Sequence, residues 1–446
     1  MVIAVGSAPV FADPTVEDQI RALEQRVKEL EAKTPALPSI PRTLDVQEPP
    51  FGEFDFAWMN GNNPQPESLL ATGRLTFSLY IDTYFGWQFH RPIDHTVFPT
   101  TTAPRHNEIS LNLAHLGVEV TGLDQLIGRV YIQYGSMVET IAGQDITTTR
   151  GFFLTNRLLQ NIEQAAAGWH FHKLHGINAE LGIFPSYVGL ESYLPEENWA
   201  YNHAFISDFT PYYFFGFRGQ FFLTRRFKLE LWVVNGWQTF GQWHESRAGG
   251  YLWNWRPREG LSLVNSFYAG REAQGDPDSL RLYSDNNLQV RYYNNPNSCF
   301  LRSLAVSVVA DVGHEHRGNA PSGWMGGAQV AHHFEWTKKW KSNLRLDFFV
   351  DQTQAISTKL PVGSPYTLPG TGRLVVGGAS ATVDYWPSPW LLTRLEYAHR
   401  EANQPYFSGH GGITGPGGIP PVDPATFTPD LEHRDDRLTF DLTLRL

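Results

Sequence analysis

The sequence predicts an all-β fold: a transmembrane, antiparallel, up-and-down β-barrel of about 16 strands, preceded by a short N-terminal coiled-coil helix. Three observations lead to this prediction. Aromatic residues make up 14% of the 446 residues and are spread along the whole chain. From residue 72 onward, segments of roughly ten residues alternate apolar and polar side chains, as barrel strands do. The connections between these segments alternate between short turns and long loops.

Composition and charge exclude several other classes of protein. Charged residues are 18% of the chain and the mean hydropathy is -0.31, so the chain is too polar for a bundle of membrane-spanning helices. The best helix-length apolar stretch, 204–223, contains Asp208 and Arg218, which are costly on a lipid-exposed helix. A net charge of -10 without a Lys/Arg cluster argues against nucleic acid as a partner. The single cysteine, Cys299, cannot form an intramolecular disulfide.

Four regions are expected along the chain. Residues 1–12 resemble the remnant of a secretory signal peptide. Residues 13–34 predict a periplasmic coiled-coil helix, because their apolar side chains recur at spacings of four and three. Residues 35–70 are expected to form a Pro-rich linker, and 71–446 the barrel. The helix either packs on its own chain or acts as an oligomerisation stalk, and contact with the cell wall is a further option.

The first expected strand shows the alternation most clearly. Leu75, Phe77 and Leu79 point to one face, which would meet lipid, whereas Thr76 and Ser78 point to the other. The same pattern recurs in three later segments: 304–312, 344–351 and 438–446. Because a charge on a lipid-facing strand position costs a few kcal/mol, the near absence of charge from the apolar face supports the assignment.

The expected connections fall into two classes. The short ones, assigned to the periplasmic side, lie near 123–124, 173–176, 224–226, 257–260, 294–299, 337–342 and 387–389. The long ones, assigned to the external side, lie near 91–106, 141–161, 188–209, 239–248, 271–280, 314–322, 353–371 and 402–433. Trp336 and Trp340 flank one short turn and Trp386 and Trp390 another, which is typical of an interfacial aromatic girdle.

The polar faces of the expected strands carry charged side chains that would make the interior of a barrel aqueous. These candidate pore-lining residues are Arg74, Asp82, Arg129, Arg218, Lys228, Glu230, Arg291, Asp311, Arg345, Asp347, Arg394, Glu396, Asp441 and Arg445. The alternative for each single residue is a pair with a neighbour along the wall, and the set as a whole favours an aqueous interior.

The most specific motif lies between residues 189 and 202. It reads Gly189-Leu190-Glu191-Ser192-Tyr193, followed by Pro195, Glu196, Glu197, Asn198, Trp199, Ala200, Tyr201 and Asn202. With Pro211-Tyr212-Tyr213 and Gly216 beyond it, this stretch resembles the OmpL-like family of β-barrel porins. The resemblance covers most of residues 70–446. It implies a porin of the bacterial outer membrane that passes small hydrophilic solutes or ions, and it implies a homotrimer.

The same resemblance implies a role for the long loop 188–209. It is the third external loop, which in porins of about sixteen strands folds inward and narrows the pore. The candidate constriction residues are Glu191, Glu196, Glu197, Asn198 and Asp208. The segment carries no Lys or Arg, so a mild cation preference is expected, because charge held in a narrow lumen concentrates counter-ions. Alternatively, these acids are solvated or pair with the wall.

Other kinds of function stay open at this point. A structural barrel, acting as a sheath for another outer-membrane component or as a cell-wall anchor, is the main alternative to a diffusion channel, and an outer-membrane hydrolase is a weaker one. No G-x-S-x-G or H-E-x-x-H motif is present, so no enzyme activity is expected. His170 and His172 share a strand face but have no further ligand at zinc spacing, so neither a metal nor a cofactor is expected.

Overall fold

A computed structural model describes residues 25–26, 49–65, 68–121, 123, 125–142, 145, 159–242, 246–273, 275–357, 372–414 and 428–446. The expected signal peptide and nearly all of the expected coiled-coil helix lie outside these residues. Within them, no helix is both long and apolar enough to span a membrane. The chain divides into two compact units, Met1–Gln47 and Glu48–Leu446, and the barrel belongs to the second.

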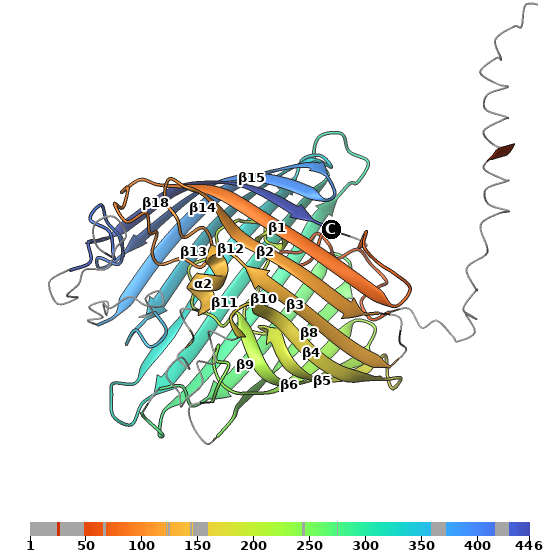
Figure 1. The fold of residues 1–446 in the computed structure, drawn as a ribbon, viewed down its shortest axis with the longest axis horizontal. Coiled ribbons are helices and arrows are strands. Elements are labelled where there is room, and N and C mark those ends of the chain that lie inside the picture. The colour runs from red at the N-terminus through yellow and green to blue at the C-terminus, as the bar shows by residue number, and fades with distance from the viewer. Residues whose placement is uncertain are drawn as a thin grey trace, which may run out of the picture. The chain divides into compact units, whose positions relative to one another are not determined.

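Sixteen strands of the described residues close into one antiparallel barrel, as the sequence predicted (Figure 1). Each strand pairs with its neighbours in the chain, and β1 closes the ring against β18. The wall strands are β1 (Leu75–Gln88), β2 (Ile109–Val120), β3 (Leu126–Tyr134), β4 (Ile162–Phe171), β5 (Ile177–Pro185), β6 (Tyr213–Thr224), β7 (Phe227–Val234), β8 (Ala248–Arg258), β9 (Leu261–Gly270), β10 (Leu280–Asn294), β11 (Ser303–His316), β12 (Gly323–Glu335), β13 (Trp340–Asp351), β14 (Leu374–Ser388), β15 (Leu391–Ala402) and β18 (Arg434–Arg445).

The alternation along each strand separates an apolar outer face from a polar inner face. On β13, Leu344 and Leu346 are exposed on the outside, whereas Arg345 and Asp347, which alternate with them, are buried inside. The two faces follow from the period of two in an extended chain, which sends successive side chains to opposite sides of the sheet. Closure of the sheet leaves no free strand edge, so every wall strand has partners on both sides.

The connections also separate into two classes. Short turns join β2 to β3, β4 to β5, β6 to β7 and each later pair at one end of the barrel, and longer loops join the strands at the other end. Within the described residues, three long loops contain regular structure of their own: α2 (Ser136–Ala142), the 3-10 helix η2 (Pro195–Glu197), and a small sheet of β16 (Phe407–Ser408) with β17 (Leu431–Glu432).

The tryptophans near the short turns do not all lie on the outside. Trp340 is exposed on the outer face, with its ring centroid 4.7 Å from that of Tyr385. Trp386 is buried instead, because it occupies an inward position of β14. Inside, its ring lies 5.3 Å from the ammonium group of Lys341. The expectation of an interfacial ring was therefore wrong for Trp386.

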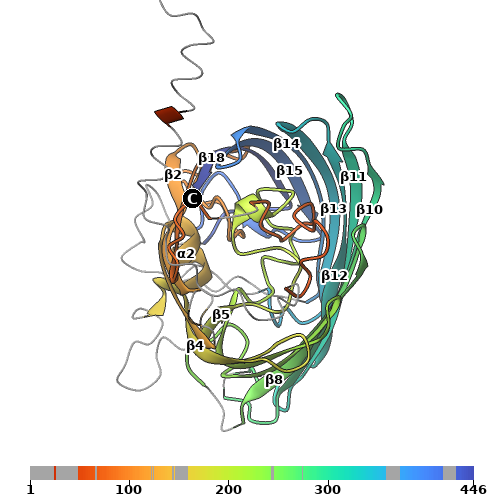
Figure 2. The same cartoon turned by 90° about the vertical axis from the view of Figure 1, so that its right-hand side faces the viewer.

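Among the described segments that are not wall strands, two divide the lumen. One is the loop 186–212 between β5 and β6, called L3 below, and the other is the N-terminal segment 49–65, which precedes β1. Figure 2 shows both within the ring, L3 in yellow-green with the short helix η2 and the N-terminal segment in orange. Residues 49–65 belong to the range 35–70 that was expected to form a linker. The lumen is therefore divided by chain that is not part of the wall.

Candidate functional site

L3 crosses the lumen because arginines of the wall bind its carboxylates and carbonyls. Arg345 of β13 donates to Glu191 (3.1 Å) and to the carbonyl of Asn202 (2.7 Å). The side chains of both Arg345 and Glu191 are only 2% exposed. An ion pair so deeply buried is costly to break, because the remaining charge would have no partner. Glu191 is thus paired with a cation of the wall, which also lies 3.6 Å from Asp347.

The short helix η2 is bound in the same way. Arg445 of β18 donates to Glu196 (2.9 Å) and to Glu197 (2.6 Å), so two carboxylates share one guanidinium. Glu196 is 4% exposed, and burial raises its pKa although Arg445 opposes this. Glu197 is less deeply buried and borders a cavity. In this part of L3, two carboxylates therefore depend on one guanidinium.

Two further arginines of β15 fix the rest of L3. Arg394 donates to the carbonyls of Pro195 (3.0 Å) and Asn198 (2.8 Å) while it pairs with Asp384 of β14 (2.7 Å). Arg400 pairs with Asp208 at 3.1 Å and donates to the carbonyl of His203 (2.6 Å). The candidate residues Asn198 and Asp208 therefore hold the loop against the wall.

Carboxylates of the same part of the wall accept hydrogen bonds from L3. Asp82 of β1 accepts from the Tyr201 hydroxyl at 3.1 Å, and Glu396 of β15 accepts from the Tyr201 amide (2.6 Å) and the Asn202 side chain (2.9 Å). Asp347 accepts from the amide of Phe205 at 3.3 Å. Polar groups of L3 thus bind one arc of the wall, from β13 through β15 and β18 to β1. L3 leaves the wall at β5 and β6, on the other side of the ring from this arc, and the loop therefore lies across the lumen.

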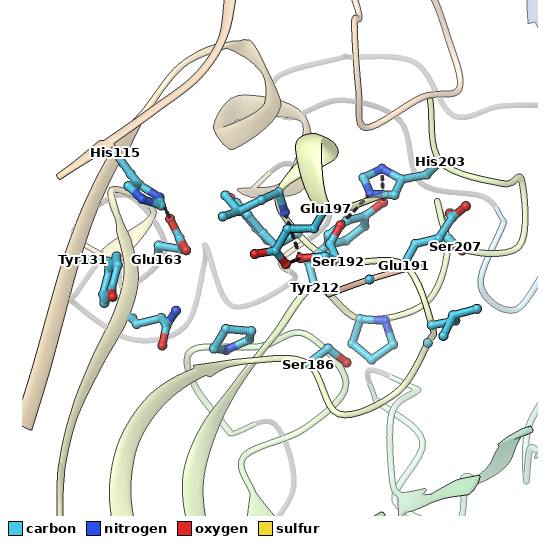
Figure 3. Close-up of a pocket in the computed structure, with 18 of the residues that line it drawn as sticks. His115, Tyr131, Glu163, Ser186, Glu191, Ser192, Glu197, His203, Ser207 and Tyr212 are labelled. Carbon is cyan, nitrogen blue, oxygen red and sulfur yellow. Dashed lines mark hydrogen bonds and ion pairs between the residues drawn. The ribbon is translucent and has the colours of Figure 1, made fainter. Parts of the chain in front are cut away.

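A polar cavity of about 450 Å³ remains between L3 and the first strands of the wall. Figure 3 shows His115, Tyr131 and Glu163 on one side of it and Ser192, Glu197 and Tyr212 of L3 on the other. Further lining residues are Ser78, Glu119, Arg129, Gln164, Gly61 and Arg445. The cavity is large enough for several waters or one small solute.

Glu119 and Glu163 are the wall carboxylates of this cavity. Glu163 lies 2.8 Å from Nδ1 of His115, and Glu119 accepts a hydrogen bond from Tyr131 at 2.8 Å. Within the described part of the chain, neither carboxylate has a lysine or arginine within ion-pair distance. Arg129 also borders the cavity, but it forms an ion pair with Glu180, which Arg218 shares. The cavity wall therefore has an excess of negative charge.

The other side of L3 is packed with apolar side chains. Phe205 is fully buried, with ring centroids 5.1 Å from Phe209 and 5.3 Å from Phe349 of β13. Tyr187 stacks on Trp232 of β7 at 4.7 Å. These residues belong to one buried cluster that also includes Phe184, Phe214, Trp237, Tyr268, Tyr283, Met325 and Phe407. Aromatic packing fills this part of the lumen.

The other candidate residues of the wall lie as follows. Arg74 precedes β1 and is exposed. Lys228 pairs with Glu230 at 2.6 Å, and Arg291 pairs with Glu259 in the turn between β8 and β9. Asp311 and Asp441 are buried on inward positions, where they accept hydrogen bonds from Tyr283 and Thr443, respectively.

Sequence reasoning missed His115, Glu119 and Glu163, which line the cavity, as well as Glu180 and Arg400. The alternation of β2, with Leu116 and Val118 outward, places His115 and Glu119 inward and could have found them. A bulge where β3 pairs with β4 disturbs the alternation close to Glu163. Among the described residues, no group of three His, Cys, Asp or Glu side chains is placed to hold a metal ion.

Comparison with solved structures finds outer-membrane proteins at low sequence identity. OmpT, an outer membrane protein of Vibrio cholerae, is 9% identical over 85% of this chain and 100% of its own, with a TM-score of 0.49. The outer membrane channel DcaP of Acinetobacter baumannii is 10% identical over 85% and 99% (TM-score 0.49). An anion-selective porin from Comamonas acidovorans is 8% identical over 83% and 99% (TM-score 0.48).

Comparison by sequence is more specific. No curated protein matches the chain. Residues 74–430 match the family described as "Putative beta-barrel porin-2, OmpL-like". This range includes all of L3 and every wall strand except β18. That range is most of the chain and agrees with the resemblance of the motif at 189–202. The chain belongs to this OmpL-like family of β-barrel porins, and it is a protein of the bacterial outer membrane.

Proposed function

We propose that this porin is a passive diffusion channel for small hydrophilic solutes and that it has a mild preference for cations. The observation that carries the proposal is the polar cavity of about 450 Å³ inside a closed barrel, between L3 and strands β1 to β4. Diffusion through such a passage needs no bond to be made or broken, so the proposed function has no catalytic step. L3 acts as the constriction, because wall arginines hold it across the lumen.

The cation preference rests on the carboxylates that arginine does not compensate. Glu119 and Glu163 border the cavity, and Glu196 and Glu197 share the single guanidinium of Arg445. Negative charge between low-dielectric walls concentrates cations in the passage. The preference should be mild, since Glu191 and Asp208 are each paired with an arginine. It should weaken as salt shortens the screening length.

We further propose that the porin assembles as a homotrimer, with the expected helix 13–34 as a stalk. The helix would contribute little alone, because short coiled coils are marginal in water. The mass of the purified protein in mild detergent tests this assembly, and removal of residues 15–33 tests the stalk. A monomeric full-length protein would contradict the trimer, whereas an unchanged trimer after the deletion would contradict the role of the stalk.

A recording in a planar lipid bilayer tests the channel itself. Stepwise currents and a reversal potential of the cation-selective sign under a salt gradient are the expected result. A barrel that inserts but carries no current would favour the second candidate, a structural or interaction barrel. One observation favours that candidate: L3, the aromatic cluster and the segment 49–65 all occupy the lumen. An anion-selective current would refute the sign of the preference.

A further inference from the structure

The segment 49–65 spans the short-turn end of the lumen. At one side, the amide of Phe51 donates to the carbonyl of Arg225 (2.8 Å) in the turn between β6 and β7. At the other side, the amide group of Gln65 donates to the carbonyl of Arg445 (3.2 Å) at the end of β18. These two attachment points belong to distant strands of the ring, so the chain between them crosses the barrel.

Aromatic side chains of the segment anchor it to the wall. The indole N–H of Trp58 donates to the carbonyl of Glu259 (3.1 Å), and the guanidinium of Arg291 lies 5.2 Å from its ring. The guanidinium of Arg256 lies 4.7 Å from the ring of Phe51 and 4.8 Å from that of Phe56. Cations placed over aromatic rings are attracted to them, most strongly where water is excluded. A segment that served only as a linker would not need these contacts.

Asn60 joins the wall to L3. Its backbone exchanges two hydrogen bonds with the Gln289 side chain of β10, at 2.8 and 3.2 Å. Its side-chain oxygen accepts from the amide of Trp199 in L3 (2.7 Å). The indole N–H of Trp199 donates to the carbonyl of Trp58 at 3.1 Å, and its ring stacks on His333 of β12. Both N–H groups of Trp199 therefore find their partners in the segment 49–65.

Gly61 completes the contact between the segment and L3. Its amide donates to the carbonyl of Glu197 (3.1 Å). Its φ is +75°, which favours glycine, and a Cβ at this position would lie 2.2 Å from the carbonyl oxygen of Leu190. Gly61 also lines the polar cavity. The segment therefore touches L3 directly beside the proposed passage.

We propose that the segment 49–65 is a second constriction element, which holds L3 in its crossing position and so sets the largest solute that the channel admits. This inference rests on the proposed function. Without the segment, both N–H groups of Trp199 and the carbonyl of Glu197 would lose their partners. Buried polar groups without partners are unfavourable, so this end of L3 would move away from its present position.

The sharpest test is Asn60→Ala in the full-length protein, with Asn63→Ala as its matched control. Asn60 is buried and bonded to Trp199, whereas the side chain of Asn63 is exposed and accepts a hydrogen bond from the nearby Gln65 amide. We expect Asn60→Ala to shift the single-channel conductance upward, to raise open-channel noise, and to let longer neutral oligosaccharides pass in liposome swelling. Asn63→Ala should behave as wild type.

A second pair of variants tests the segment in case the loss of one hydrogen bond has only a small effect on the current. Gly61→Ala forces the segment away from Leu190 while adding only one methyl group, and Gly73→Ala meets nothing within 4 Å. Folding of every variant is checked by its heat-dependent mobility on gels. Wild-type protein without current would refute the proposed function. Wild-type current with unchanged conductance and size limit in both Asn60→Ala and Gly61→Ala would refute the role of the segment.

Discussion

The two sides of L3 differ in polarity and in packing. Toward strands β1 to β4, L3 borders a polar cavity lined by His115, Glu119 and Glu163. On its other side, Phe205 and Phe209 pack into an aromatic cluster with side chains of later strands, such as Phe349. A barrel of sixteen strands is wide enough for an aqueous channel, yet here much of the lumen is filled. The proposed passage therefore lies to one side of the lumen, beside β1 to β4, and its width depends on L3 and not on the number of strands.

The largest expected effect is on the packed side. Phe205→Ala removes a fully buried ring in contact with Phe209, Phe349 and Phe407, and should cost about 3–5 kcal/mol of stability. We expect the temperature at which the barrel loses its folded gel mobility to fall clearly. Leu344→Ala, on the exposed outer face, serves as the control. Equal loss in both variants would show that the aromatic cluster contributes no more to stability than a side chain on the outer face.

A bulky residue on the polar side should block current without loss of stability. Gln164 lines the cavity from β4, and Ala167 on the same strand is exposed on the outer face. Gln164→Trp should remove most of the single-channel conductance, whereas Ala167→Trp should leave it unchanged. Wild-type conductance in Gln164→Trp would mean that solutes take another path, and the comparison of the two sides would fail.

The charges of the two sets of carboxylates should act unequally on selectivity. Glu119→Gln removes a cavity charge that forms no ion pair with a lysine or arginine of the described residues, so the reversal potential should shift away from cation selectivity. Replacing Glu191 and Arg345 together by Gln removes a buried pair without a change in net charge. That double variant should therefore keep a reversal potential close to wild type, provided that it folds. A larger shift of the reversal potential in the double variant than in Glu119→Gln would mean that the carboxylates of L3 set the selectivity.

The smallest effect is expected at the exposed edge of the N-terminal segment. Glu53 forms an ion pair with Arg226 at 2.7 Å, and the hydrogen bond from Arg226 lowers the pKa of Glu53. Exposed pairs of this kind contribute little, because water and salt screen them. Glu53→Gln should leave both gel stability and conductance unchanged. A clear rise in conductance would show that this edge, in addition to Asn60, holds the segment in place.

The sequence by itself determined the wall. The alternation in 75–89, 344–351 and 438–446 specifies which side chains face outward, because a strand has a period of two wherever it lies. The same local pattern, with the turn residues, located the short turns and the long loops and led to a sixteen-stranded barrel. The motif at 189–202 indicated L3 and its family before any contact was known.

Only the tertiary structure decided what occupies the lumen. Glu191 and Arg345 lie 154 positions apart, and nothing in either local sequence indicates that they pair. The segment 49–65 has no period that predicts a strand or helix, so its place beside Trp199 follows only from contacts with distant strands. Partners across a lumen depend on how a loop folds into a closed ring. The wall, in contrast, depends on patterns that each strand carries by itself.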